Sequence, residues 1–296
     1  MSDKSAIEWT EATWNPVTGC SKVSQGCKHC YAERDWARLS ANPKTAYFGR
    51  AFTDVRFHPE RLDQPFRWTK PRRIFVNSMA DLFHEDVPDE FIDRVFAAMA
   101  RSRWHTYQVL TKRAARMGAY LGNPERKGRI LAASVGLGWA GMMDMPWPLP
   151  HVWIGVSVED QVTADERIPL LLQTPAAVRW ISAEPLLGPV DLPGLFYYGT
   201  ERSGGIVPLR EKGHAMLDWV VVGGESGPKA RPMHPDWVRS LRDQCAETSV
   251  PFLFKQWGEW LPSNQNQDRD NWCCRAGKKA AGRHLDGQLH DEYPSA

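Results

Sequence analysis

Three cysteines in one short segment are the residues of this chain whose type and spacing best suit metal chemistry. Cys20, Cys27 and Cys30 form the pattern C-x6-C-x2-C, and no fourth cysteine lies nearby in the sequence. Structural zinc sites close their shell with four protein ligands, and electron-transfer [4Fe–4S] centres use four cysteines. Three thiolates therefore indicate a [4Fe–4S] cluster that keeps one iron for a substrate or cofactor.

A zinc site is the alternative for the same segment. His29 or His84 can complete a Cys3His shell. His29, however, stands inside the C-x2-C pair, where its ring cannot easily bind a metal together with both flanking thiolates. The other cysteines are not expected to be ligands: Cys245 falls on an apolar helix face, and Cys273 and Cys274 are adjacent in a polar tail without an assigned role.

Length and composition limit the class of protein. With 296 residues, of which 42% are hydrophobic, the chain can form one large domain or two ordinary ones. No apolar run is long enough to span a membrane, and the first residues lack the apolar stretch of a signal peptide. We therefore expect a cytoplasmic protein without membrane contact, whose reduced cysteines bind metal and form no disulfides. A net charge of +2 does not by itself indicate nucleic-acid binding.

Fourteen tryptophans are many for this length. We expect most of them to fill the core and support loops. The alternative is base stacking in a nucleic-acid channel, which requires exposed rings beside Lys or Arg.

Short apolar runs alternate with amphipathic stretches along most of the chain. The expected strands cover residues 13–17, 73–77, 106–110, 152–156, 178–182, 219–222 and 251–254. Helices are expected after Pro88, after the acidic start at Asp165 and after Asp236. Near-continuous apolar strands between helices indicate a parallel sheet with right-handed crossovers. The pattern predicts an α/β fold of about six to seven βα units that form a partial or complete parallel (β/α) barrel.

The expected barrel domain covers residues 1–261. Two polar or Gly-rich stretches, at about 136–150 and 197–217, are insertions that serve as lids or substrate loops, or are disordered. Residues 262–296 are polar and form a C-terminal appendage.

Polar or ionisable residues follow every expected strand. Active sites of parallel barrels lie at the carboxyl ends of their strands, and turn chemistry alone favours Gly, Asn, Asp and Pro over Glu, Lys and Arg. These residues therefore predict a site for a zwitterionic, hydroxyl-bearing ligand, although any one glutamate can instead be a helix cap or a salt-bridge partner. The residues concerned are the three cysteines, Ser78, Asp81, Lys112, Arg113, Ser157, Glu159, Glu184, Gly223, Gly224, Glu225 and Lys255.

The motifs themselves resemble a known family. The segments at 14–20, 26–33, 77–83, 155–160, 182–187, 223–227, 254–258 and 277–287 are similar to those of the phage Gp37/Gp68 family, also described as the three-Cys-motif family DUF5131. The cysteine loop after the first strand also resembles the radical S-adenosylmethionine (SAM) superfamily. It departs from the common C-x3-C-x2-C spacing, because the first gap is six residues long and the aromatic Tyr31 follows the last cysteine.

The resemblance implies a radical SAM-like barrel and a radical SAM enzyme. Cys20, Cys27 and Cys30 would hold a [4Fe–4S] cluster, and an electron donor would reduce it so that SAM is cleaved to methionine and a 5′-deoxyadenosyl radical. No catalytic residue is assigned. The implied SAM-binding residues are Ser78 and Asp81 near the methionyl amine, Ser157, Glu159 and Glu184 in the middle, and Gly223, Gly224 and Glu225 near the ribose or adenine.

The substrate is unknown, with modification or repair of a nucleic acid or nucleotide as the leading expectation. Two alternatives remain open at this stage. One is a non-catalytic, zinc- or cluster-stabilised nucleic-acid-binding protein, for which a basic surface stripe is expected. The other is a partner subunit of a phage or mobile-element system.

Overall fold

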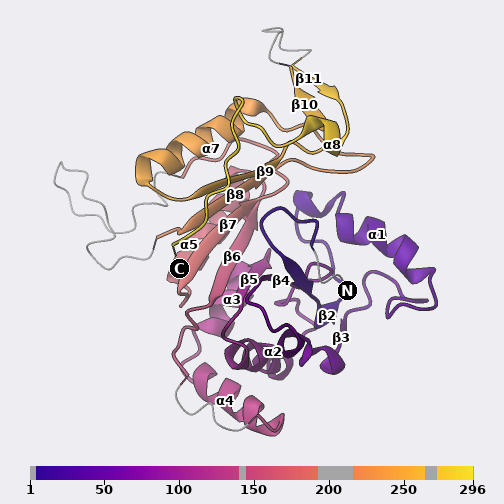
Figure 1. The fold of residues 1–296 in the computed structure, drawn as a ribbon, viewed down its shortest axis with the longest axis vertical. Coiled ribbons are helices and arrows are strands. Elements are labelled where there is room, and N and C mark those ends of the chain that lie inside the picture. The colour runs from indigo at the N-terminus through magenta and orange to yellow at the C-terminus, as the bar shows by residue number, and fades with distance from the viewer. Residues whose placement is uncertain (1–4, 140–144, 193–215, 264–271, 296) are drawn as a thin grey trace, which may run out of the picture. The chain divides into compact units, whose positions relative to one another are not determined.

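The computed structural model describes residues 5–139, 145–192, 216–263 and 272–295, and they form a mixed α/β fold (Figure 1). Its centre is a seven-stranded sheet. In pairing order the strands are β1 (Ala12–Trp14), β4 (Arg73–Val76), β5 (Thr106–Thr111), β6 (Val152–Val158), β7 (Val178–Ala183), β8 (Trp219–Gly223) and β9 (Phe252–Gln256).

The strand order confirms the parallel α/β prediction. Each strand of the sheet lies beside the next one along the chain, and the neighbouring strands are parallel. This is the order found in (β/α) barrels. Among the described residues the sheet begins at β1 and ends at β9, so it is the partial form of that topology. All seven expected strands are present, with ends that differ by a few residues.

The largest difference concerns the first strand. The predicted strand 13–17 is divided into β1 and a separate strand, β2 (Val17–Thr18), which pairs with β3 (Arg56–Phe57). Pro16 between them has no backbone N–H for the sheet, and its carbonyl accepts a hydrogen bond from the His58 N–H (2.8 Å). The chain therefore leaves the sheet at this proline.

Contacts divide the chain into two compact units. Unit 1 contains residues 1–24, 30–156 and 174–178, and unit 2 contains residues 25–29, 157–173 and 179–296. The predicted domain boundary at residue 261 stays a prediction. Of the two predicted insertions, residues 140–144 and 197–215 lie outside the described residues.

Unit 1 buries the predicted face of its second helix. The helices are α1 (Tyr31–Ser40), α2 (Asp89–Arg101), α3 (Ala114–Leu121) and α4 (Arg126–Gly136), with short 3-10 turns at η1 (Gln25–Cys27, in unit 2), η2 (Pro59–Arg61) and η3 (Gln64–Arg67). Phe91, Ile92 and Phe96 of α2 are buried as the helical spacing predicts. The buried Arg126 joins α4 to α2 through an ion pair with Asp93 (2.7 Å).

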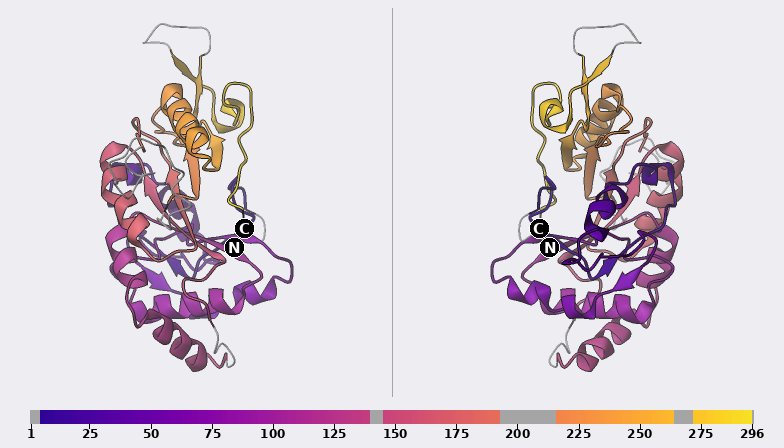
Figure 2. Two further views of the ribbon diagram at one scale, coloured as in Figure 1. Left: turned by 90° about the vertical axis from the view of Figure 1, so that its left-hand side faces the viewer. Right: turned by 90° about the vertical axis from the view of Figure 1, so that its right-hand side faces the viewer.

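Unit 2 holds the C-terminal part of the chain. Its helices and hairpin are α5 (Gln161–Gln173), α7 (Pro235–Thr248), β10 (Trp260–Pro262), β11 (Cys273–Arg275) and α8 (Lys278–Ala281). The last residues run beside β9, as Figures 1 and 2 show, because Phe254 N–H donates to the His290 carbonyl (3.0 Å) and the Trp219 indole to the Glu292 carbonyl (2.8 Å). The predicted appendage thus covers the edge strand of the sheet.

One carboxylate fastens the C-terminal segment to α7. Asp286 accepts from Arg239 (2.8 Å) and Arg242 (2.7 Å), and these bonds lower its pKa from 3.8 to about 2. A lowered pKa adds stability that is present above pH 3.8 and is lost as the pH falls towards 2. Because Asp286 is partly exposed, we expect Asp286→Asn to lose only about 1 kcal/mol at pH 6. Urea denaturation of both proteins should show this difference vanish near pH 2; a constant difference would contradict the assignment.

The tryptophan prediction is confirmed for most of the rings. Eight are buried: Trp9, Trp14, Trp36, Trp68, Trp153, Trp180, Trp219 and Trp257. Among the helices that the structure describes, none has the length and apolar character needed to cross a bilayer.

Candidate functional site

The cysteine loop is the segment from Cys20 to Cys30. In unit 1 the residues at its two ends contact the segment that follows β4. Gly19 N–H donates to the Met79 carbonyl (3.1 Å), and the Tyr31 hydroxyl donates to the Ser78 carbonyl. The side-chain oxygen of Asn15 accepts from the Ser78 hydroxyl (3.1 Å) and from Met79 N–H (3.0 Å). Ser78 therefore lies where the sequence predicts it, at a strand end beside the cysteine loop.

Asp81 joins the carboxyl ends of β4 and β5. Its carboxylate accepts from the Thr111 hydroxyl (2.7 Å), from the N–H groups of Phe83 (2.9 Å) and Lys112 (3.1 Å), and from Arg113 (3.2 Å). Both oxygens thus already hold several protein hydrogen bonds. These bonds make Asp81 a structural anchor between the segments that follow β4 and β5. Its predicted contact with the methionyl amine stays a prediction.

Arg113 connects this anchor to the first cysteine. Its guanidinium lies 3.8 Å from the Cys20 sulfur and donates to the Ser21 hydroxyl (2.8 Å), to Asp81 and to Glu85 (2.8 Å). Burial lowers the pKa of Arg113, but Asp81, Glu85 and Cys20 outweigh it and the net pKa is raised. A fixed positive charge therefore lies beside Cys20.

Arg113→Gln is expected to destabilise the protein by about 3 kcal/mol, because it leaves the buried Asp81 carboxylate without its cation. It should also raise the pKa of Glu85 from about 2 towards 4.5. Urea denaturation and a carboxyl NMR titration measure the two effects. Glu85→Gln is the control, and since Glu85 is exposed, its loss should cost less than about 1 kcal/mol. Equal stability of the two variants would contradict this role of Arg113.

In unit 2 the middle of the cysteine loop, residues 25–29, lies on the carboxyl ends of β6 and β8. The Gly26 Cα faces Glu159 so closely that a Cβ would lie 2.4 Å from its carboxylate oxygen. Arg231 donates to the Gln25 carbonyl (3.0 Å). Burial raises the pKa of Glu225, but Arg231 and, more weakly, His29 hold it below its ordinary value. Cys27 therefore belongs to a segment that contacts Glu159 and is hydrogen-bonded to Arg231, the partner of Glu225.

Each of the three glutamates that the sequence predicts for the site has a cation as its partner. Arg167 pairs with Glu159 (3.2 Å), Lys255 with Glu184 (2.8 Å) and Arg231 with Glu225 (2.6 Å). The Ser157 carbonyl also accepts from Arg167 (2.7 Å). The salt-bridge alternative thus holds for all three glutamates. Each of these three glutamates is thus matched by one cation.

Gly223 and Gly224, at the end of β8, are closely packed against the protein itself. A Cβ on Gly223 would lie 2.4 Å from the Glu184 carboxylate, and one on Gly224 would lie 2.0 Å from the Trp257 carbonyl oxygen. Gly258, with a φ of 82°, faces the Glu225 carbonyl in the same way. The predicted contact of Gly223 and Gly224 with a ligand stays a prediction.

All three cysteines of the loop are outside any disulfide and are half-buried. Cys20 follows the Gly19–Met79 hydrogen bond, Cys27 ends η1, and Cys30 is the N-cap of α1. The His84 imidazole and the Ser21 hydroxyl share a hydrogen bond (2.8 Å). Across the described ranges, no group of three or more His, Cys, Asp or Glu side chains is placed to hold a metal ion.

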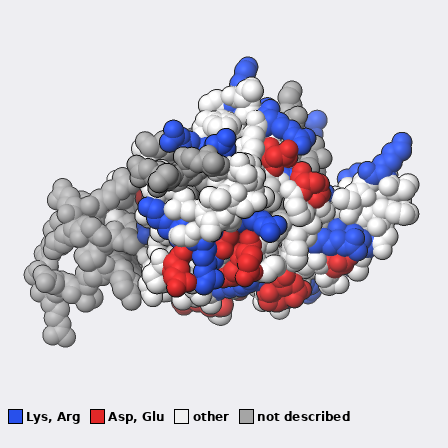
Figure 3. Space-filling view, turned by 90° about the horizontal axis from the view of Figure 1, so that it is seen from below, with Lys and Arg blue, Asp and Glu red and all other residues white. Residues whose placement is uncertain are grey.

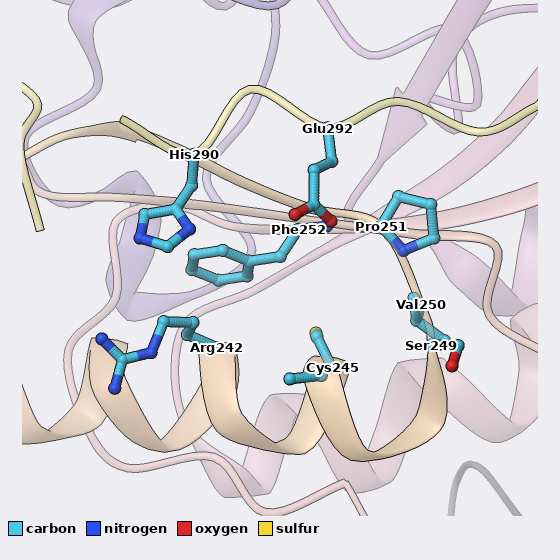
Figure 4. A pocket seen from close by; sticks show the side chains of 9 residues that line it. Arg242, Cys245, Ser249, Val250, Pro251, Phe252, His290 and Glu292 are labelled. Carbon is cyan, nitrogen blue, oxygen red and sulfur yellow. The ribbon is translucent and has the colours of Figure 1, made fainter. Parts of the chain in front are cut away.

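A cavity of about 310 Å³ lies elsewhere in unit 2, at the amino end of β9 (Figure 4). It is lined by residues of α7, by the start of β9 and by the last residues of the chain, with Cys245, Phe252, His290 and Glu292 among them. Burial raises the pKa of Cys245 to about 12, so this thiol is neutral. Cys245 is the core thiol that the sequence predicts.

Of the cations of the site, sequence reasoning names Arg113 and Lys255 and leaves out Arg167 and Arg231. Arg113 lies shortly after β5 and Lys255 is the penultimate residue of β9, and this position near a strand end was the available signal. Arg167 and Arg231 have no such signal, because nothing in the order of residues pairs them with Glu159 and Glu225.

One family model matches the chain, over residues 4–294, and its description is "Protein of unknown function (DUF5131)". No curated protein and no solved structure matches the chain.

Proposed function

Since the chain belongs to the DUF5131 family, whose description gives no activity, we propose a function from the site itself: a radical SAM enzyme. Cys20, Cys27 and Cys30 would hold a [4Fe–4S] cluster. When bound and reduced, such a cluster supplies the electron for reductive cleavage of SAM. An electron donor is required as a partner.

The position of the cysteine loop is the observation that supports this proposal most. In unit 1 its ends lie on the residues that follow β4 and β5, and in unit 2 its middle lies on those that follow β6 and β8. Cofactors and substrates of parallel barrel-type sheets bind at this edge.

The donor set fits a cluster in its chemistry. Thiolates of a cluster carry negative charge, and Arg113 lies beside Cys20 while Cys30 begins α1, whose N-terminal dipole favours negative charge. Because the described residues hold no preformed metal-binding group, the fit rests on this donor set and its charges. The proposal requires the loop to bring its three sulfurs together around the irons.

The paired charges suit a zwitterionic ligand with ribose hydroxyls. Glutamates of Glu–Lys and Glu–Arg pairs can accept from hydroxyl and amine groups, while their cations meet a carboxylate. We assign the methionyl amine to Ser78 and Asp81, the middle of SAM to Ser157, Glu159 and Glu184, and the ribose or adenine to Gly223, Gly224 and Glu225.

Anaerobic reconstitution tests the proposal. The purified chain is treated with iron and sulfide, its visible spectrum and metal content are recorded, and it is then incubated with dithionite and SAM. A brown protein that forms 5′-deoxyadenosine is the expected result. A colourless protein that holds one zinc ion and leaves SAM intact would overturn the proposal.

The non-catalytic nucleic-acid-binding alternative predicts a continuous basic stripe on the surface. On the one face drawn in Figure 3, which is seen from below Figure 1, Lys and Arg are interspersed with Asp and Glu. The metal and SAM measurements above decide between the two.

A further inference from the structure

The β10–β11 hairpin is fastened to the carboxyl ends of β8 and β9 through one residue of unit 2. Glu259 accepts at its carbonyl from the N–H groups of Ala276 and Gly277, both at 3.0 Å. Its own N–H donates to the Glu225 carbonyl (3.2 Å), and its carboxylate accepts from Gly227 N–H (2.9 Å). The hairpin is therefore held directly beside the Glu225 end of the proposed SAM site.

Aromatic rings gather on the hairpin and on the first turn of α7. Trp237, Trp260 and Trp272 are half-buried, in contrast to the eight tryptophans of the cores. The His234 ring lies 4.9 Å from the Trp272 ring and 5.8 Å from the Trp237 ring. The Trp260 indole is fixed by a hydrogen bond to the Ala230 carbonyl (2.7 Å). These rings are partly open to solvent and are held in place.

Exposed cations lie in the same segments of the chain as these rings. The Arg275 guanidinium lies 5.8 Å from the centre of the Trp260 ring and donates to the Gly227 carbonyl (2.9 Å). Lys229, Lys278 and Lys279 are exposed as well. Among the described residues of the same segments, the acidic side chains are the exposed Asp236 and the half-buried Glu259, whose carboxylate is hydrogen-bonded to Gly227. Positive charge therefore predominates among these described residues.

We propose that this hairpin surface binds single-stranded nucleic acid; the surface comprises Lys229, His234, Trp237, Trp260, Trp272, Arg275, Lys278 and Lys279. Half-exposed rings offer faces on which unpaired bases stack, and the cations neutralise phosphates. Because the hairpin is fastened beside Glu225, a bound strand would pass the proposed SAM site. The inference rests on the proposed function in that it makes the substrate of the enzyme a nucleic acid.

Binding is measured on the full chain with labelled single-stranded DNA and RNA of about 15 nucleotides, by fluorescence anisotropy at several salt concentrations. Lys278→Gln with Lys279→Gln is expected to weaken binding about tenfold at low salt. It should also reduce the slope of log K against log salt by about 1.4, since each lost phosphate contact contributes about 0.7. Trp272→Ala is expected to weaken binding about tenfold through lost stacking.

The matched control is Lys44→Gln with Lys70→Gln, which removes two exposed lysines from unit 1. It should bind as the unaltered chain does. Equal binding by the two double variants, equal affinity for duplex DNA, or equal affinity for poly-glutamate would overturn the inference, the last in favour of an acidic protein partner. Circular dichroism verifies that each variant folds.

Failure of this inference is distinguishable from failure of the proposed function. Strand binding requires neither iron nor SAM, and formation of 5′-deoxyadenosine is measured without nucleic acid. Binding by a chain that holds zinc and does not cleave SAM would contradict only the proposed function. Cleavage by a chain that does not bind strands would contradict only the hairpin assignment.

Discussion

Cys27→Ala is expected to lose nearly all of the iron that the reconstituted chain holds, from about four irons per chain to near zero. With three thiolates available, removal of one leaves two, too few to retain the cluster. Formation of 5′-deoxyadenosine should be lost with the iron. Iron and sulfide analysis and the visible spectrum of the anaerobically reconstituted protein measure the effect.

Cys274→Ser is the matched control, because Cys274 is an exposed thiol outside the loop. It should keep both the iron and the SAM cleavage. If Cys27→Ala held as much iron as this control, the cluster would have other ligands and the assignment of the loop would be wrong.

Gly224→Ala is expected to destabilise the protein by about 3 kcal/mol and to lower its melting temperature by about 5–10 °C. The new Cβ would lie 2.0 Å from the Trp257 carbonyl oxygen, and a backbone atom cannot move aside as a flexible side chain can. The loops that follow β8 and β9 would have to separate. Differential scanning calorimetry measures the change.

Gly128→Ala provides a control of opposite sign. Gly128 lies in α4, is exposed, and has no atom within 4 Å of an added Cβ. Alanine should raise the stability there by up to about 1 kcal/mol, because it has a higher helix propensity than glycine. A neutral result for Gly224→Ala beside a stabilising Gly128→Ala would mean that the two loops are not in contact.

Most of the fold could be predicted because buried parallel strands have a simple sequence pattern. The run Trp219–Gly223 is apolar on both faces, and such a run between helices can hardly be anything but a central strand. The strand at 13–17 was predicted too long because its apolar pattern continues across Pro16, and the pairing of β2 with β3 involves residues far apart in the chain.

The candidate site could be predicted only in part. Strand ends follow from the order of elements, and therefore Ser78, Glu159 and Glu184 could be named. The partners of these residues could not, since Lys255 meets Glu184 across 71 positions and Arg113 meets Cys20 across 93. Pairings of this kind depend on three-dimensional packing.

Tryptophans show the same limit. Trp219 stands inside an apolar strand and is buried as expected, whereas Trp260 begins a short polar hairpin and stays half-exposed. The sequence analysis places Trp219 in a strand and Trp260 in no predicted element, and it does not separate a core ring from a ring that can meet a ligand.

The four hydrogen bonds of Glu259 also determine how this part of unit 2 opens. The amide hydrogens of Gly227, Ala276 and Gly277 all bond to this one residue. Each of these amide hydrogens can exchange with solvent only when its bond to Glu259 breaks. The bonds hold the hairpin and the loop after β8 together. Local opening of the hairpin and of the β8 loop should therefore be a single cooperative event, seen as similar exchange rates at the three amides.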